Sequence, residues 1–314
     1  MNEVQKQYSD PDEIGLRELI SVTWAGKWIV LVVTIIASLI ASVYVFSLPN
    51  IYKSDVLLAA AEDSSLNIPG QLGGLAALAG VNLGEKGGDK TTLALQILKS
   101  RDFIGKFIEQ NNLYIEIMAA EGWDRVTNSL VIDSEIYDSA SNEWVREVKA
   151  PFKPKPSTME TFDEFKKLFS VNQDKTSGMI TVSIEHYSPY LAKEWVDRLV
   201  KAINEDMRQR DLAEAERSIA YLNSKIDQTN IADVRSMLFS LIEEQTKTVM
   251  LANVREEYVL KTIDPAVVSE KKAKPNRILI IILTTILSSM IAVFGVIILH
   301  FNRRHTESLN INGH

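Results

Sequence analysis

The sequence predicts an α+β domain that carries one long projecting helix and is anchored by two transmembrane helices. Three observations predict this fold. Two uncharged apolar blocks bracket the chain, strand patterns lie between them, and a long apolar stripe of helical spacing follows the last strand pattern. The region between the blocks, residues 49–277, is long enough to bury its own core.

The two apolar blocks run from Trp28 to Leu48 and from Ile278 to Leu299. Each has roughly 21 or 22 residues, enough for a helix to cross about 30 Å of hydrocarbon. Because backbone polar groups in lipid must be paired internally, we expect both blocks to be helices. The alternative for the first block is a cleavable signal peptide. The acid-rich stretch before this block and its long apolar run argue against that alternative.

Two spans place both termini on the same side of the membrane. Lys27 abuts the first span and Arg303–Arg304 follow the second, so the positive-inside rule puts residues 1–27 and 300–314 in the cytoplasm. Four cations just before the second span oppose this orientation: Lys271, Lys272, Lys274 and Arg277. Long loops translocate largely regardless of charge, so we expect residues 49–277 to lie outside the cytoplasm.

The first half of the middle region predicts a strand followed by helical segments. Pro49 ends the first span because it lacks an N–H and its ring clashes with the preceding turn. Residues 51–58 predict a strand, and the glycine-rich residues 62–90 predict a mobile loop or a weak apolar helix. Residues 91–112 predict a helix that Ser100 restarts.

The second half begins with a segment of Asp, Ser and Pro, and we expect residues 120–160 to be irregular. Residues 160–169 predict a short helix. Residues 168–174 and 178–187 have the pattern of two strands and are separated by a turn, which predicts a β-hairpin.

A long helix follows this hairpin and dominates the middle region. Ser188 and Pro189 are typical of a helix start, and the helical pattern runs from 189 to about 260. Its first apolar stripe is proposed to pack in a stalk or between subunits: Leu191, Trp195, Leu199, Ile203 and Met207. An unbroken helix of this length would span on the order of 110 Å, so part of it must project from the domain.

A projecting apolar stripe needs a partner helix. One alternative is a chain that folds back near Thr229–Asn230, and the other is packing against a neighbouring subunit. Both can hold together. We therefore predict a homo-oligomer whose helices stand away from the membrane.

The composition argues against catalysis and against several ligand classes. The chain has 314 residues, a formal net charge of −7 and no cysteine, so neither a nucleic-acid surface nor a thiol-ligated metal is indicated. Carboxylates such as Glu243–Glu244 lie among Lys and Arg, as expected for a solvated helix face rather than a catalytic pair. No histidine lies in a catalytic motif. We expect no catalytic residue, no cofactor and no metal.

One segment nearly matches a phosphate-binding loop. Residues Gly84 to Thr91 fit G-x-x-x-x-G-K-[ST] except that Asp89 replaces the second glycine. A carboxylate at this position would repel phosphate, so we interpret the segment as a glycine-rich loop that leads into a helix.

The spans themselves indicate anchoring and packing. No ionisable residue lies inside either one, which disfavours a transport pathway. Small residues form ridges that allow close helix approach in lipid, and we propose that these ridges pack: Ser288, Ala292 and Gly295 in the second span, Ala37 and Ala41 in the first. The alternative is that small residues are simply common in spans.

The order of these parts resembles the polysaccharide co-polymerase family, the Wzz-type O-antigen chain-length determinants. Six segments carry the resemblance, in this order: Ile14–Trp28, Pro49–Leu58, Leu75–Gly84, Leu93–Ile104, Ser188–Arg208 and Thr262–Arg277. Their order and spacing carry more weight than any one of them alone.

The resemblance implies a membrane-proximal α/β domain, a long projecting helix and several copies in a periplasmic ring. It implies a partner as well, an integral-membrane polymerase that acts on undecaprenyl-linked repeats. The protein would sit in the inner membrane of a Gram-negative bacterium and bias how far the chain of repeats grows. No residue would be catalytic.

Three alternative functions stay open. The same anatomy would serve a capsular or exported exopolysaccharide. A two-span sensory receptor would need an output module, for which the roughly 15 residues after the second span are too few. A periplasmic enzyme anchored twice would need the catalytic groups that the sequence lacks.

Overall fold

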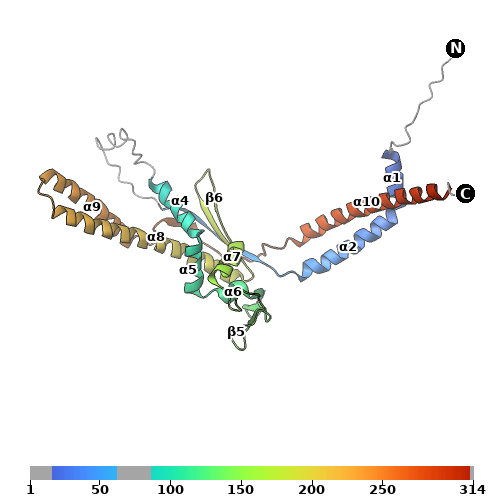
Figure 1. Cartoon of the computed structure of the whole chain (residues 1–314), viewed down its shortest axis with the longest axis horizontal. Helices are drawn as coiled ribbons and strands as arrows, with labels where there is room; N and C mark the ends of the chain where they lie inside the picture. The colour runs from blue at the N-terminus through green and yellow to red at the C-terminus, as the bar shows by residue number, and fades with distance from the viewer. Residues whose placement is uncertain (1–15, 62–85, 312–314) are drawn as a thin grey trace, which may run out of the picture. The chain divides into compact units, whose positions relative to one another are not determined.

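The computed structural model describes residues 16–61 and 86–311, and it divides into two compact units (Figure 1). One unit joins the two end segments of the chain. The other is the domain Asn50–Lys274. The fold class predicted from the sequence is confirmed, because long helices and a mixed set of strands make up the domain and an apolar helix lies near each end.

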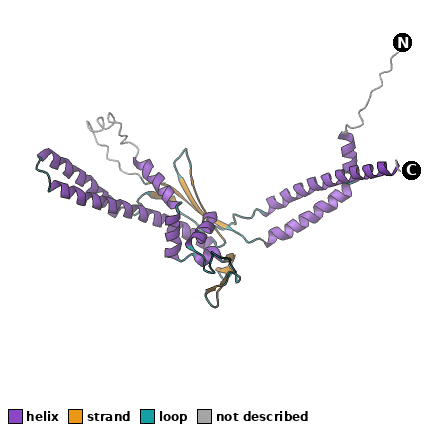
Figure 2. Ribbon diagram, viewed as in Figure 1, coloured by secondary structure: helices purple, strands orange, loops and turns teal. Residues whose placement is uncertain are grey.

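The end segments form three helices: α1 (Leu16–Ala25), α2 (Lys27–Ser47) and α10 (Arg277–Ile311). Helices α2 and α10 lie side by side (Figure 2). Within the described residues, Lys27–Ser47 and Arg277–His300 are long and apolar enough to cross a membrane. Most of their apolar side chains are exposed, unlike those of a core helix in a soluble protein. Both helices therefore fit a membrane anchor.

A four-stranded antiparallel sheet forms the centre of the domain, in the order β6-β7-β1-β8. Its strands are β1 (Tyr52–Ala60), β6 (Phe169–Gln173), β7 (Ile180–His186) and β8 (Leu260–Asp264). Strand β1 pairs with β7 from Tyr52 opposite His186 to Leu58 opposite Ile180. The strand predicted at 51–58 and the hairpin predicted from 168 to 187 are confirmed.

Helices cover the sheet and close its core. They are α4 (Lys86–Leu98), α5 (Arg101–Asn111), α6 (Tyr114–Met118) and α7 (Thr158–Leu168), together with the first half of α8 (Pro189–Ile226). Ser100 caps α5 through the Phe103 N–H, which confirms the predicted restart. Ser157 and Glu160 form a capping box at the start of α7, in which each side chain bonds the backbone N–H of the other residue. The helix therefore begins at Thr158, two residues before the predicted start at 160.

Residues 120–160 are more regular than the sequence predicts, and this expectation is corrected. Two small hairpins occupy most of the segment: β2 (Ala120–Asp124) with β3 (Ser129–Ile132), and β4 (Tyr137–Asp138) with β5 (Glu143–Trp144). Asn128 and Asn142 take left-handed backbone conformations at the two turns. The strands are too short to show a clear alternating pattern, which explains the wrong prediction.

The long helical segment is a hairpin. Helix α8 ends at Ile226, the chain turns, and α9 (Ala232–Val254) returns alongside it. Of the two alternatives for the apolar stripe, the fold-back near Thr229–Asn230 is present. The predicted helix end at about 260 is wrong, because α9 ends at Val254 and Leu260 already belongs to β8.

Candidate functional site

The stripe proposed for stalk or subunit packing lies inside the domain. Trp195, Leu199, Ile203 and Met207 are at most 2% exposed and belong to the core cluster, and Leu191 packs against it half-buried. This half of α8 lies across β1 and β7. A buried side chain cannot reach a second copy, so the assignment of these residues to subunit contacts is corrected.

Aromatic rings hold this half of α8 in place. The Trp195 ring lies 5.9 Å from the Phe165 ring of α7 and 4.8 Å from the His186 imidazole at the end of β7. Such tilted pairs add to the stabilisation that burial gives. The start of α8 is therefore packed on the sheet, and the rest of the helix extends beyond the sheet together with α9.

The distal hairpin, residues 211–254, is the candidate assembly surface. Few of its side chains are buried within the protomer, chiefly Ala215 and Ile226 of α8 with Leu238 and Ala252 of α9. Many large apolar side chains are exposed: Tyr221, Ile231, Met237, Phe239, Leu241, Met250 and Val254. Exposed apolar patches of this kind mark interaction surfaces.

A buried asparagine joins the base of the hairpin to the sheet. The Asn204 amide donates to the carbonyl oxygens of Val200 and Leu260, at 3.2 and 3.0 Å. Its side-chain oxygen accepts from the backbone N–H groups of Val259 and Leu260, at 2.8 and 2.9 Å. Every hydrogen-bonding group of this amide side chain is thus used, three of the four bonds reaching the chain around β8.

A second polar contact lies one step further along α8. The Asp211 carboxylate pairs with the Lys90 ammonium of α4 at 3.0 Å and accepts from the Tyr258 hydroxyl at 2.6 Å. Three segments far apart in the sequence therefore meet where the hairpin leaves the domain. Lys90 was noted in the sequence as part of a near phosphate-binding loop. In the structure Lys86 to Thr91 are helical, and residues 84–85 lie outside the described part.

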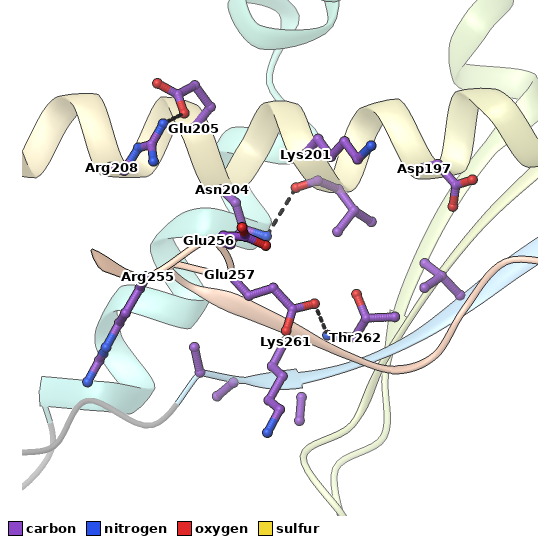
Figure 3. Close-up of a pocket in the computed structure, with 15 residues that line it drawn as sticks. Asp197, Lys201, Asn204, Glu205, Arg208, Arg255, Glu256, Glu257, Lys261 and Thr262 are labelled. Carbon is purple, nitrogen blue, oxygen red and sulfur yellow. Dashed lines mark hydrogen bonds and ion pairs between the residues drawn. The ribbon is translucent and has the colours of Figure 1, made fainter. Parts of the chain in front are cut away.

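A groove of about 1220 Å³ opens beside Asn204, between α8, β1 and the segment 255–262 (Figure 3). Its ionisable lining is four acids and four bases: Asp197, Glu205, Glu256 and Glu257 with Lys201, Arg208, Arg255 and Lys261. Arg208 pairs with Glu205, and Glu257 accepts from the Thr262 N–H. The acidic and basic side chains of the groove are thus equal in number.

The imidazole of His186 is buried at the start of α8. One ring nitrogen lies 3.1 Å from the Glu116 carbonyl oxygen, and the other accepts the Ser188 N–H at 3.1 Å. Burial lowers the pKa of His186, although the hydrogen bond with the Glu116 carbonyl oxygen opposes the shift. Burial also raises the pKa of the nearby Glu116 carboxyl, and the charge of Glu194 adds to this. The side chain of His186 thus serves as a neutral structural group.

The helix pair α2–α10 uses small residues at its contact. Ser288 and Ala292 are buried, and Ala37 and Ala41 are half-buried. Gly295 lies off the contact, because a Cβ added there would meet nothing within 4 Å. Packing of these five residues within the membrane stays a proposal.

Two contacts of the helix pair escaped the sequence analysis. The hydroxyl groups of Ser38 and Thr285 lie 2.9 Å apart across the pair. The Arg277 guanidinium donates to the carbonyl oxygens of Val45 and Leu48 at the end of α2. A cation at a helix C-terminus is favourable, so Arg277 stabilises the outer end of this pair. The acceptors of these two hydrogen bonds lie 232 and 229 residues before Arg277, so no local pattern in the sequence predicts the bonds.

Across residues 16–61 and 86–311, no group of three His, Asp or Glu side chains is placed to hold a metal ion. Glu243 and Glu244 are exposed on α9, as expected for a solvated face. Glu185, which precedes His186 in the sequence, pairs with Lys274 at 2.6 Å.

The chain has an α+β domain with a helical hairpin and, near each end of the sequence, an apolar helix that fits a membrane anchor. Residues 12–111 match the model of the family described as chain length determinant protein, Wzz. The resemblance inferred from the sequence is thereby confirmed.

Two solved structures are similar to the chain. A full-length bacterial polysaccharide co-polymerase has 11% identity and a TM-score of 0.39, over 92% of this chain and 99% of that one. A fragment of WzzB, the polysaccharide co-polymerase from Salmonella Typhimurium, has 10% identity and a TM-score of 0.34, over 72% and 100%. No curated protein matches the sequence.

Proposed function

We propose that this protein regulates the chain length of O-antigen, the polysaccharide of lipopolysaccharide, as a non-catalytic oligomeric co-polymerase beside a membrane polysaccharide polymerase. The match of residues 12–111 to the chain length determinant family carries the proposal and supports chain-length regulation. The proposal assigns structural roles to the side chains of Asn204 and Asp211, which join separate elements of the domain.

In this proposal the protein spans the inner membrane twice through α2 and α10. Both termini lie in the cytoplasm, and the domain lies in the periplasm. The supporting observations are the two exposed apolar helices and the basic residues at their cytoplasmic ends. A reporter-fusion map that places residues 86–260 in the cytoplasm would overturn this topology.

The working unit is a homo-oligomeric ring. The distal hairpin offers the contact, because many of its large apolar side chains are exposed in the described part of the chain. The groove at the base of the hairpin offers polar side chains to the undecaprenyl-linked glycan near the polymerase. Light scattering in mild detergent tests the ring, and a monomer would count against it.

Deletion of the gene, followed by gel analysis of lipopolysaccharide, tests the function. We expect polymer still to be made, with loss of a modal chain length. If the lipopolysaccharide ladder stays unchanged, O-antigen is not the target, and a change in the size of capsular or exported polysaccharide would identify the alternative.

A further inference from the structure

Three aromatic side chains from distant parts of the chain meet outside the core of the domain. The Trp123 ring of β2 lies edge-on to the Tyr52 ring of β1, with centroids 5.6 Å apart, and 6.1 Å from the Tyr190 ring of α8. None of the three belongs to the core cluster, and Tyr190 is half exposed. We refer to Tyr52, Trp123 and Tyr190 as the aromatic triad.

The triad lies at the end of the domain where the chain enters and leaves. The Ile51 N–H donates to the Lys274 carbonyl oxygen at 3.0 Å, so the two ends of the domain Asn50–Lys274 are paired. Tyr52 follows Leu48, the cap of the first apolar helix, by four residues. The triad therefore includes a residue close in sequence to the end of that helix.

The turn between β2 and β3 adds an exposed apolar tip beside the triad. Val126 is 94% exposed. The turn is held by the Asp124 carboxylate, which accepts from the Val126 N–H at 2.9 Å and from the Thr127 hydroxyl at 2.7 Å. The Trp123 indole N–H donates to the Asn128 side chain at 3.0 Å, which fixes the indole ring. A rigid turn thus presents a valine to the surroundings.

Cations lie on the segment that leaves the domain at the same end. Lys271, Lys272 and Lys274 are exposed, and Lys274 also pairs with Glu185. These cations opposed the predicted orientation of the spans and have no part in the proposed function. Aromatic rings with Lys nearby are the composition found at membrane–water interfaces, where rings lie among the headgroups and ammonium groups meet lipid phosphates.

We propose that the aromatic triad, the Val126 tip and the lysines at 271–274 form a docking surface for the phosphate-headgroup layer of the membrane that holds the chain's own spans. The inference rests on the proposed membrane anchoring and goes beyond chain-length regulation. Docking would fix the height and tilt of the domain, and with it the direction in which the hairpin projects.

Tryptophan fluorescence of the full-length chain tests the proposal, in vesicles of phosphatidylcholine and phosphatidylglycerol that carry a nitroxide on the lipid headgroup. The signal of Trp123 is the difference between the wild type and Trp123→Phe. Helix α8 offers two reporter positions at different distances from the triad, because Tyr221 lies 31 residues beyond Tyr190, about 47 Å along the helix. Tyr190→Trp and Tyr221→Trp are therefore matched reporters, both at exposed tyrosines.

We expect the signals of Trp123 and Tyr190→Trp to be quenched and that of Tyr221→Trp to be unchanged. Trp28, at the start of the first span, reports anchoring through Trp28→Phe. Quenching of Trp28 without quenching of Trp123 overturns the docking surface and leaves the anchor intact. Loss of quenching at both positions overturns the anchor as well. Shielding of Trp123 by added oligosaccharide but not by lipid would overturn the proposal in favour of sugar stacking.

Val126→Asp is a second test that does not endanger folding, since Val126 makes little contact with the domain. We expect it to reduce the quenching of Trp123 without a change in melting temperature. Unchanged quenching in Val126→Asp and in a double variant, Lys271→Glu with Lys272→Glu, would refute the roles of the tip and the lysines.

Discussion

Asn204 at the base of the hairpin supports a quantitative prediction. Asn204→Ala removes three bonds between α8 and the chain around β8, those with the Val259 N–H, the Leu260 N–H and the Leu260 carbonyl. At about 1 kcal/mol each, their loss lowers the free energy of unfolding by ~3 kcal/mol. For a domain of this size the melting temperature falls by roughly 6–12 °C.

Asn253 of α9 provides a matched control. It is exposed, and its amide donates only to the Val249 carbonyl oxygen four residues earlier, as Asn204 donates to Val200. Thermal melts of full-length Asn204→Ala and Asn253→Ala in the same detergent therefore isolate the bonds to β8. We expect the control to melt within about 2 °C of the wild type. Equal melting temperatures for the two variants would refute the role given to Asn204.

Three further predictions concern assembly, pH and helix capping. Phe239→Asp should convert the oligomer to smaller species by light scattering, because a carboxylate is costly to bury at an apolar subunit contact. The lowered pKa of His186 means that the unfolded chain binds a proton more readily, so stability is present above pH 6.5 and is lost as the pH falls toward the folded pKa. Thermal melts from pH 7 downward should show this loss, and His186→Asn should reduce it. Ser157→Ala should lower the free energy of unfolding by about 1 kcal/mol in the same melts, because it removes the cap of α7.

Each of these has a distinct contrary result. An unchanged oligomer in Phe239→Asp would exclude the exposed face of α9 as the contact. If the loss of stability at low pH persists in His186→Asn, a group other than His186 causes it. Glu116 does not explain such a loss, because its raised carboxyl pKa favours the folded state at low pH. Ser240→Ala changes an exposed serine within α9 and is the control for Ser157→Ala. Equal melting temperatures of these two variants would show that the α7 cap contributes no stability.

The parts of the fold that local patterns encode were predictable. The spans at 28–48 and 278–299 are long uncharged runs, and Ser188–Pro189 starts α8 through a cap whose chemistry lies within four residues. The hairpin of β6 and β7 follows from alternation around one turn. In each case the sequence signal and the stabilising contact lie in the same short segment.

The parts that depend on distant contacts were not predictable. Strand β8 has five residues, and its position is set by pairing with β1 and by Asn204, 56 residues before Leu260. The stripe from Leu191 to Met207 has the spacing of a helix face but carries no information on what covers it. In the structure the sheet covers that stripe, and we therefore propose the distal hairpin as the assembly surface. The aromatic triad likewise joins residues 52, 123 and 190.

We propose that assembly through the hairpin, rather than catalysis, sets polymer length. The most direct measurement is the chain-length distribution of lipopolysaccharide in a deletion strain complemented with the wild type or with Phe239→Asp. The wild type should restore a modal length, and the variant should leave the amount of polymer unchanged but its length unregulated. A normal modal length from a variant that no longer assembles would contradict the claim.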